Sequence, residues 1–193
     1  FVKNPYLQDT GNEYNKDISS APGGERCPGA LADEDGDTRS PCLSLRGGSA
    51  FMKIMYVTSE CAPFIKTGGL GDVAGSLPQA LAAKGHDVRV FCPLYSAIDQ
   101  SMREKFYYIK NAKPLGWRNQ YCGIFRYEAD GVTYYFIDNE YYFARGQIYG
   151  EYDDAERFAY YSKAVLEVLP DLEWKPDVIN CNDWQTALVP VYY

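Results

Sequence analysis

Residues 66–72, with the sequence KTGGLGD, combine a lysine with three glycines and end on an aspartate. Glycine lets the backbone come close to a ligand and direct its N–H groups at a phosphate. A lysine adds a full positive charge on a flexible stem, which stabilises a pyrophosphate leaving group. The segment therefore predicts a phosphate-binding turn built on Lys66, Gly68, Gly69 and Gly71. A glycine-rich turn with a solvated lysine and no ligand is the simpler alternative.

Two other phosphate-binding motifs fit this sequence less well. The P-loop string GxxxxGK[ST] does not occur. Gly69, Gly71 and Ala74 satisfy the loose dinucleotide pattern GxGxx[GA], but they begin about ten residues after the preceding strand pattern, whereas that fingerprint follows its strand at once. The second strand pattern also ends without the carboxylate that would bind an adenosine ribose. A nicotinamide or flavin oxidoreductase therefore stays open as an alternative.

Histidine and cysteine offer little for a metal site or for nucleophilic catalysis. The one histidine, His86, lies in the turn pattern KGHD, where we expect a surface residue and not a catalytic base. The six cysteines form no CxxC pair and no Cys/His spacing typical of zinc, so we expect no metal. Reduced thiols in a cytoplasmic protein are the simplest interpretation. The cysteines are Cys27, Cys42, Cys61, Cys92, Cys122 and Cys181.

Strand and helix patterns on both sides of the glycine-rich turn would position it. A strand pattern over 53–58 precedes the turn, and a helix pattern over 73–84 follows it and ends at Gly85. Pro78 must bend that helix or lie in its first turns. The other predicted elements are strands over 87–92, 106–109, 120–127, 132–137 and 177–181, a helix over 153–169 and a helix that begins at 183 and runs to 193.

Strands that alternate with helices predict an α/β fold, a Rossmann-like doubly wound parallel sheet. Asp130-Gly131 is a typical two-residue hairpin turn between two of the strands. Open sheets of this kind bind ligands beyond the carboxyl ends of their strands, where a helix N-terminus favours anions. The glycine-rich turn follows the first strand and is therefore expected at that edge.

The chain divides near residue 51 into two parts of different composition. Residues 1–51 contain 7 Gly and 4 Pro, and only 16 of these 51 residues are apolar. Too little apolar area is available to offset the entropy of ordering, which predicts a disordered or weakly ordered leader. The leader has neither the apolar stretch of a secretory signal nor the basic excess of a transit peptide. Residues 52–193 form the predicted domain.

Deletion of residues 1–51 is expected to leave the free energy of unfolding unchanged, because this segment contributes little core. Denaturant titration of the full chain and of a chain that begins at Met52 would measure the difference. A loss of about 2 kcal/mol or more, the size of a true core contribution, would show that the leader is packed.

The charge balance excludes some classes of partner. The chain carries 19 Lys and Arg against 26 Asp and Glu, a net charge of −7, so it lacks the basic excess that nucleic-acid binding requires. No apolar run approaches the roughly 18 residues of a membrane span. We therefore expect neither a nucleic acid nor a membrane as a partner.

Several spaced motifs resemble the N-terminal part of bacterial glycogen synthase and plant starch synthase. They are TSE at 58–60, KTGGLGDV at 66–73, IYG at 148–150, DDAERFA at 153–159 and NDWQTAL at 182–188. The resemblance implies a retaining transfer of glucose from an ADP-glucose donor to the non-reducing end of an α-1,4-glucan (glycogen or maltooligosaccharide) acceptor, without metal or cofactor. It also implies the N-terminal, acceptor-side domain of a glycosyltransferase B fold. That domain would be incomplete here, and the chain would be inactive by itself.

The resemblance also assigns residues to the donor and acceptor sites. Lys66, with Gly68 and Gly69, would contact the sugar nucleotide, and Asp72 belongs to the same loop. Glu60 would lie near the acceptor sugar. Each assignment has a structural alternative: Asp72 would stabilise the first helical turn through the helix dipole, and Glu60 would be an ordinary loop carboxylate.

Two further residues match the family's catalytic positions. Asp183 corresponds to the active-site carboxylate of the DW motif, and Tyr149 to an active-site aromatic residue. Asp183 also lies where a helix N-cap belongs, and Tyr149 would serve equally well in packing. Gln185 stands where many relatives carry His, a change that matters only if the position must be charged.

Three functional classes remain open at this point: the glucosyltransferase, the oxidoreductase and a non-catalytic glucan-binding fragment. The resemblance at the KTGGL motif favours ADP-glucose over UDP-glucose as the donor. The oligomeric state is not predicted.

Overall fold

The computed structural model describes residues 51–112 and 119–193. The predicted leader lies outside these residues except for Phe51, so its order and the domain boundary stay predictions. Cys27 and Cys42 also lie outside the described residues.

The described residues form a six-stranded sheet with helices on both faces, in the strand order β3-β4-β5-β2-β1-β6. Four neighbouring strands are parallel: β5 (Val132–Asp138), β2 (Asp87–Pro93), β1 (Lys53–Val57) and β6 (Val178–Cys181). The predicted Rossmann-like α/β class is confirmed. β1 lies between β2 and β6 with both faces covered, and Met55, Tyr56 and Val57 are fully buried in it.

The other two strands, β3 (Tyr107–Asn111) and β4 (Gly123–Ala129), run antiparallel and extend the sheet beyond β5. The predicted hairpin turn explains this difference from an all-parallel sheet. Asp130 and Gly131 both have positive φ, 52° and 74°, and they join β4 directly to β5. A two-residue turn with this geometry can connect only antiparallel strands.

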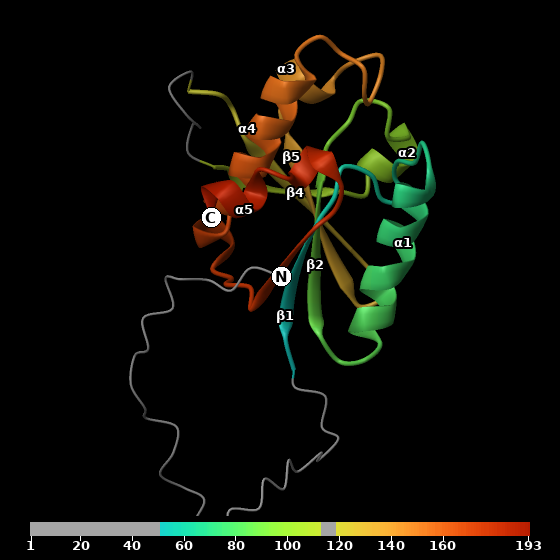
Figure 1. Cartoon of the computed structure of the whole chain (residues 1–193). Coiled ribbons are helices and arrows are strands. Elements are labelled where there is room, and N and C mark those ends of the chain that lie inside the picture. The colour runs from blue at the N-terminus through green and yellow to red at the C-terminus, as the bar shows by residue number, and fades with distance from the viewer. Residues whose placement is uncertain (1–50, 113–118) are drawn as a thin grey trace, which may run out of the picture. The chain divides into compact units, whose positions relative to one another are not determined.

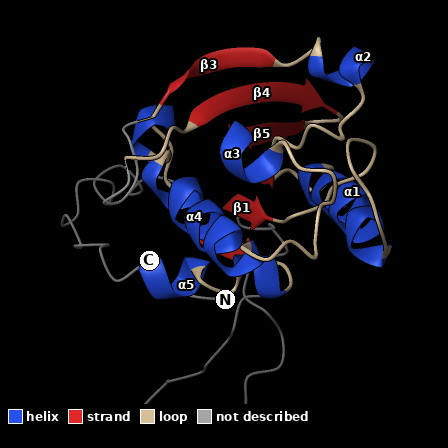
Figure 2. Ribbon diagram, turned by 90° about the horizontal axis from the view of Figure 1, so that it is seen from above, coloured by secondary structure: helices blue, strands red, loops and turns tan. Residues whose placement is uncertain are grey.

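Helices cover both faces of the sheet (Figures 1 and 2). The helix α1 (Gly69–Ala82) lies on one face, and α4 (Asp154–Glu167) lies on the other. Shorter helices complete the domain: α2 (Gln100–Arg103), α3 (Glu140–Phe143) and α5 (Val189–Tyr192), with 3₁₀ turns at Pro170–Leu172 and Trp184–Thr186.

The helix α1 begins at Gly69, four residues before the predicted start, and it contains Pro78 in its interior. Proline has no N–H to donate to the carbonyl of residue 74. The buried thiol of Cys61 donates to that carbonyl of Ala74 instead, at 3.2 Å. A side chain from the preceding loop therefore satisfies the carbonyl that Pro78 leaves without its helical partner.

The predicted helix over 183–193 is wrong in its continuity. The chain forms a 3₁₀ turn at Trp184–Thr186 and then the separate short helix α5. Pro190 lies at the start of α5, where it cannot donate to a carbonyl of the preceding turn. The helix is therefore interrupted between the two segments.

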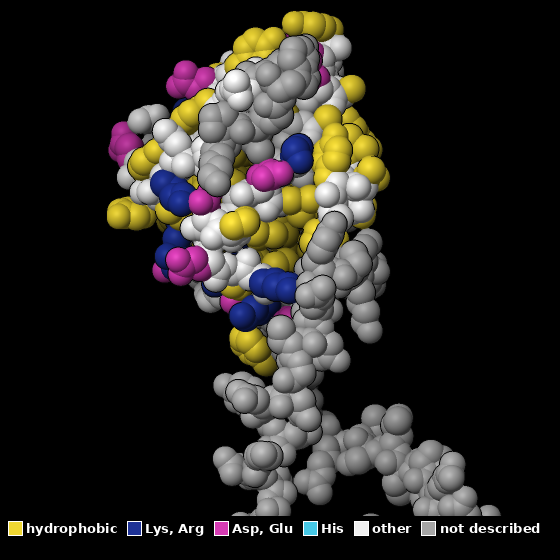
Figure 3. Space-filling model, turned by 90° about the vertical axis from the view of Figure 1, so that its left-hand side faces the viewer, with side chains coloured by type: hydrophobic (Ala, Val, Ile, Leu, Met, Phe, Trp, Pro, Cys, Tyr) yellow, Lys and Arg dark blue, Asp and Glu magenta, His cyan; other side chains and the backbone are white. Residues whose placement is uncertain are grey.

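The described residues contain no helix long and apolar enough to span a membrane. On the described part of the face in Figure 3, Lys and Arg side chains alternate with Asp, Glu and hydrophobic side chains. The described residues of this face therefore form no continuous basic patch that would suit a nucleic acid.

Candidate functional site

The predicted site residues gather at the carboxyl ends of β1 and β6. Glu60 follows β1, Asp183 follows β6, and the segment 66–72 leads into α1. The loop between α3 and α4 carries Tyr149 to the same edge. The two strand ends are tied together, since the side-chain amide of Asn182 donates to the carbonyl of Val57 at 2.8 Å.

Glu60 is the residue that joins these segments. Its side chain is 3% exposed, and its carboxylate accepts hydrogen bonds from the backbone N–H of Thr67 at 2.5 Å and from the Thr67 hydroxyl at 2.7 Å. It also accepts from the N–H of Gly68 at 3.3 Å and from the Tyr149 hydroxyl at 2.7 Å. The carboxylate therefore holds the glycine-rich segment against the Tyr149 loop, and its contact with an acceptor sugar stays a prediction.

Tyr149 is held from two sides. Its hydroxyl donates to Glu60, so the Ser59 hydroxyl, 2.8 Å away, donates to Tyr149 in turn. Burial raises the pKa of Tyr149 well above its usual value, and the neighbouring carboxylate adds to this effect. The phenol therefore stays protonated. The half-buried Tyr149 ring lies beside the rings of Phe158 and Trp184.

The pKa of Glu60 reflects the balance between burial and hydrogen bonding. Burial alone would raise this pKa, but the hydrogen bonds from Thr67, Tyr149 and Gly68 outweigh burial and leave the pKa below its usual value. Glu60 is therefore ionised in the folded protein at neutral pH.

Glu60→Gln is expected to lower the free energy of unfolding at neutral pH. On acidification, the variant should lose less of its unfolding free energy than the wild type. A depressed native pKa contributes stability above the unfolded-state pKa, and this contribution is lost as the pH falls through the native value. The gap between the two proteins should thus narrow below about pH 4. Urea titrations of both proteins across this range measure the gap, and a gap that stays constant with pH would contradict the assigned role of the carboxylate.

Lys66 forms an ion pair with Asp72 at 2.7 Å, and both side chains are about half exposed. Exposed pairs of this kind contribute little to stability, so an incoming anion can replace the aspartate at small cost. Asp72 lies in the first turn of α1, which also agrees with its predicted role beside the helix dipole.

The N-terminus of α1 has no side-chain cap, and Gly68 occupies the N-cap position with extended backbone. A Cβ atom added to Gly68 or Gly69 would meet nothing within 4 Å. Open space thus adjoins the first turn of a 14-residue helix, next to the Lys66 ammonium. Backbone N–H groups, the helix dipole and a lysine together suit a phosphate group.

Glycine at 71 and 75 serves close packing instead. A Cβ at Gly71 would lie 2.9 Å from the Lys66 side chain, and one at Gly75 would lie 2.8 Å from the carbonyl oxygen of Ala62. The chain at Ala62 and at Lys66 can therefore come this close to α1 only because positions 75 and 71 have no side chain.

Gly75→Ala and Gly69→Ala form a matched pair with opposite expected effects. Gly75→Ala should cost about 1–3 kcal/mol of unfolding free energy, because backbone must move to admit the methyl group. Gly69→Ala should leave stability unchanged or raise it by up to about 1 kcal/mol, since the site is open and helical. Thermal and urea unfolding of both variants provide the test, and equal losses would contradict the open space at Gly69.

Asp183 has an uncommon backbone conformation, with φ 63° and ψ −179°. This region is occupied almost solely by glycine and costs of the order of 1–3 kcal/mol for other residues. One carboxylate oxygen accepts from the N–H of Trp184 at 2.7 Å, so Asp183 makes the capping contact that the structural alternative predicted. The residue is exposed, however, and the strain is unexplained by a capping role alone.

Gln185 turns away from the exposed edge and is 3% exposed. Its side-chain oxygen has no hydrogen-bond partner among the described residues. A charged group would be costly at this buried position, so the neutral glutamine suits its surroundings.

Sequence reasoning missed the aromatic wall beside Tyr149. The Trp184 ring is 51% exposed and lies with its centroid 5.0 Å from the Phe158 ring and 6.2 Å from the Tyr149 ring. Its position directly after Asp183 was the available signal. The Trp184 ring lies at 55° to the Tyr149 ring and at 81° to the Phe158 ring, so its own exposed face is the surface on which a sugar can stack.

Thiols and metal ligands contribute nothing further to the site. The four described cysteines are free, and burial raises the pKa of Cys61 to about 12 and that of Cys122 to about 11. Within residues 51–112 and 119–193, no group of three or more His, Cys, Asp or Glu side chains could hold a metal ion.

A Rossmann-like sheet with an uncapped helix N-terminus and a lysine at its carboxyl edge is typical of nucleotide-binding domains. The comparison with known proteins makes this class specific. Residues 53–193 match the family model for the starch synthase catalytic domain, and the chain therefore belongs to this glycosyltransferase family.

Individual relatives agree with the family model. The chain is similar to a glycogen synthase of Clostridium botulinum, with 59% identity over 72% of this chain and 30% of the relative. It is also similar to one of Anoxybacillus flavithermus, with 54% identity over 72% and 29%. The catalytic domain of starch synthase IV from Arabidopsis thaliana, bound to ADP and acarbose, is 35% identical, with a TM-score of 0.64 over 72% of this chain and 29% of that one. The chain spans about 30% of the length of the curated relatives it matches.

Proposed function

We propose that residues 52–193 form the acceptor-side domain of a retaining α-1,4-glucan synthase that transfers glucose from ADP-glucose to a glycogen or maltooligosaccharide chain in the cytoplasm. The observation that carries the proposal is the Glu60 network, which joins the glycine-rich segment to Tyr149 at the carboxyl edge of the sheet. Below, "the complete enzyme" means a polypeptide that carries these residues together with the remaining length found in the relatives.

The donor diphosphate binds at the N-terminus of α1. Lys66 exchanges its exposed pair with Asp72 for the diphosphate, and the first-turn N–H groups of α1, from Gly69 onward, bind its oxygens beside the open space at Gly68. As the bond to glucose breaks, negative charge grows on the leaving phosphate. The lysine ammonium stabilises this charge most strongly in the transition state.

The acceptor glucan lies against the aromatic wall. Sugar rings stack on Tyr149 and Trp184, and the exposed Asp183 carboxylate binds sugar hydroxyls through the oxygen that the Trp184 N–H leaves free. A retaining transfer of this kind uses the leaving phosphate as the base for the acceptor hydroxyl. The second domain of the complete enzyme holds that phosphate from the other side.

Glu60 positions the two substrate-binding segments relative to each other. Its carboxylate fixes the donor segment through Thr67 and Gly68 and the acceptor surface through Tyr149. One buried anion thereby sets the distance between the two substrates, which determines how often they meet in a reactive geometry.

The test is an assay of the complete enzyme with labelled ADP-glucose and glycogen. We expect label in the glucan, its release by an α-1,4-specific amylase, and little transfer from UDP-glucose. Binding of NAD without transfer would support the oxidoreductase instead, and glucan binding without transfer would support the non-catalytic fragment. Either result would overturn the proposal.

A further inference from the structure

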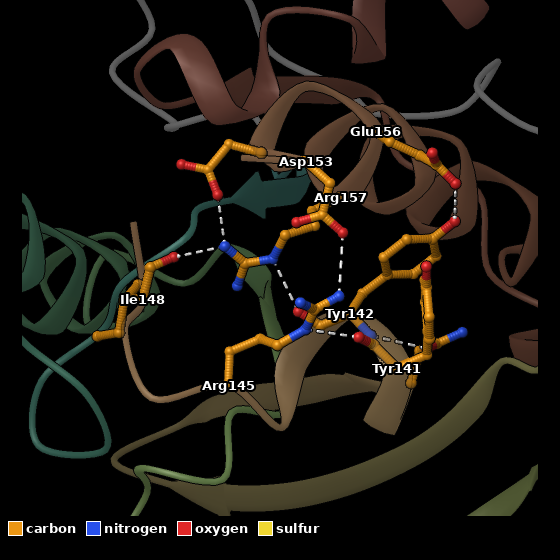
Figure 4. A network of polar contacts seen from close by, with 9 residues as sticks. Tyr141, Tyr142, Arg145, Ile148, Asp153, Glu156 and Arg157 are labelled. Atoms are coloured by element: carbon orange, nitrogen blue, oxygen red, sulfur yellow. Dashed lines mark hydrogen bonds and ion pairs between the residues drawn. The ribbon is translucent and has the colours of Figure 1, made fainter. Parts of the chain in front are cut away.

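One ion pair of α4 fastens the Tyr149 loop on both sides of that residue, and Figure 4 shows the side on which Arg157 reaches Ile148. Nη1 of Arg157 donates to the carbonyl oxygen of Ile148, directly before Tyr149, at 3.1 Å. The backbone N–H of Gly150, directly after Tyr149, donates to the Asp154 carboxylate at 2.7 Å. Arg157 and Asp154 in turn bind each other at 2.5 Å. Both peptide groups that flank Tyr149 are therefore fixed to charged side chains that are themselves paired.

Arg157 is an unusual residue to find at this place. Its side chain is fully buried, and Nε donates to the carbonyl oxygen of Tyr142 in α3 at 2.8 Å. A buried guanidinium is costly unless paired and hydrogen-bonded, and an apolar side chain of similar volume would fill the space without that cost. The planar fork of arginine, however, can bind a carboxylate and two carbonyl oxygens in one fixed arrangement. Arg157 thus ties α3, the Tyr149 loop and α4 together.

Tyr149 needs such a support, because its own loop has little regular structure to hold it. The loop has left-handed backbone at Gly150, with φ 89°, and lies between the ends of α3 and α4. The contact from the Tyr149 hydroxyl to Glu60, 2.7 Å long, spans 89 residues of sequence. A shift of the loop by an ångström would break this contact and release Glu60 from one of its partners.

We propose that Arg157 is a positioning residue for glucosyl transfer. It touches no substrate. Through Ile148 and Asp154 it holds Tyr149 against Glu60, and Glu60 in turn holds the donor segment at Thr67 and Gly68. The effect on transfer rests on the proposed function, whereas the effect on the loop does not.

The first test is amide hydrogen exchange on the 193-residue chain with Arg157→Lys, which keeps the charge and loses the fork. The amides of Thr67, Gly68 and Gly150 should exchange faster by about tenfold or more, while those of β2 and β5 keep wild-type rates. Arg89→Lys is the matched control, since Arg89 also pairs with an aspartate and a tyrosine but lies in β2, outside this loop.

Wild-type exchange at the three amides, or a uniform rise across the sheet, would overturn the proposal. Should Arg157→Lys fail to fold, Asp154→Asn gives the same comparison, because it keeps an oxygen for the Gly150 N–H and loses the charge. This readout needs no catalysis, so it decides the positioning role even if the complete enzyme transfers no glucose.

The second test is a double-mutant cycle on the turnover number of the complete enzyme. Arg157→Lys should lower kcat by up to about 10²-fold, the scale for a reactive group displaced by about 1 Å. If Arg157 acts through the Tyr149 hydroxyl, adding Tyr149→Phe should slow the enzyme little further. Losses that simply multiply would show that Arg157 acts elsewhere and would overturn the proposal.

Discussion

The polypeptide of residues 1–193, incubated alone with ADP-glucose and glycogen, is expected to transfer no glucose above a no-protein blank. Holding donor and acceptor in a reactive geometry can supply roughly 7–11 kcal/mol of a barrier. The residues at the carboxyl edge of this sheet form only one side of the binding site that would hold both substrates. The chain spans about 30% of the length of its relatives, and we expect the facing wall in the remainder.

Radiolabelled donor makes the comparison sensitive, with a full-length relative such as the Clostridium botulinum glycogen synthase as positive control. Weak binding of ADP-glucose or maltooligosaccharide to the isolated chain would agree with the proposal. Label in glycogen that disappears with Asp183→Ala would contradict it, because one wall would then suffice for transfer.

Lys66→Gln in the complete enzyme is expected to lower the turnover number by about 100-fold. Glutamine is one atom shorter than lysine; it keeps a hydrogen-bond donor but removes the charge opposite the diphosphate. An interaction that strengthens as the leaving group gains charge typically contributes about 3 kcal/mol. Stability should change little, because the pair with Asp72 is exposed.

Lys110→Gln is the matched control for this substitution. Lys110, 45% exposed, forms an ion pair at 2.6 Å with Asp171, which is 24% exposed, but it lies on β3, at the opposite edge of the sheet from β6. Its variant should keep the wild-type rate. Wild-type turnover in Lys66→Gln, measured at saturating ADP-glucose, would remove Lys66 from the site.

Local signals in the sequence predict the fold well where they act over a few residues. The pair Asp130-Gly131 specifies a hairpin because both positions accept positive φ, and Gly85, with φ 90°, ends the first helix as expected. The break before α5 has an equally local cause, Pro190, which the prediction of one continuous helix over 183–193 did not take into account. The motif-based resemblance is confirmed by the family match.

Contacts between distant segments set what the sequence does not reveal. The start of α1 at Gly69 follows from Glu60, whose carboxylate takes the N–H groups of Thr67 and Gly68 and so ends the loop there. Glu60 and Tyr149 are 89 residues apart, and no periodic pattern in the sequence predicts the hydrogen bond between them. The same holds for Arg157, which reads as an ordinary polar position of an amphipathic helix and is fully buried.

The most direct test of the account is a crystal structure of the complete enzyme with ADP and a maltooligosaccharide. We expect the diphosphate within about 3 Å of Lys66 Nζ and of the N–H groups at the start of α1, with the pair between Lys66 and Asp72 opened. The glucan should lie against Tyr149 and Trp184, with a hydroxyl bound to Asp183. A diphosphate bound elsewhere, with the Lys66–Asp72 pair intact and the N-terminus of α1 empty, would contradict the site proposed for this chain.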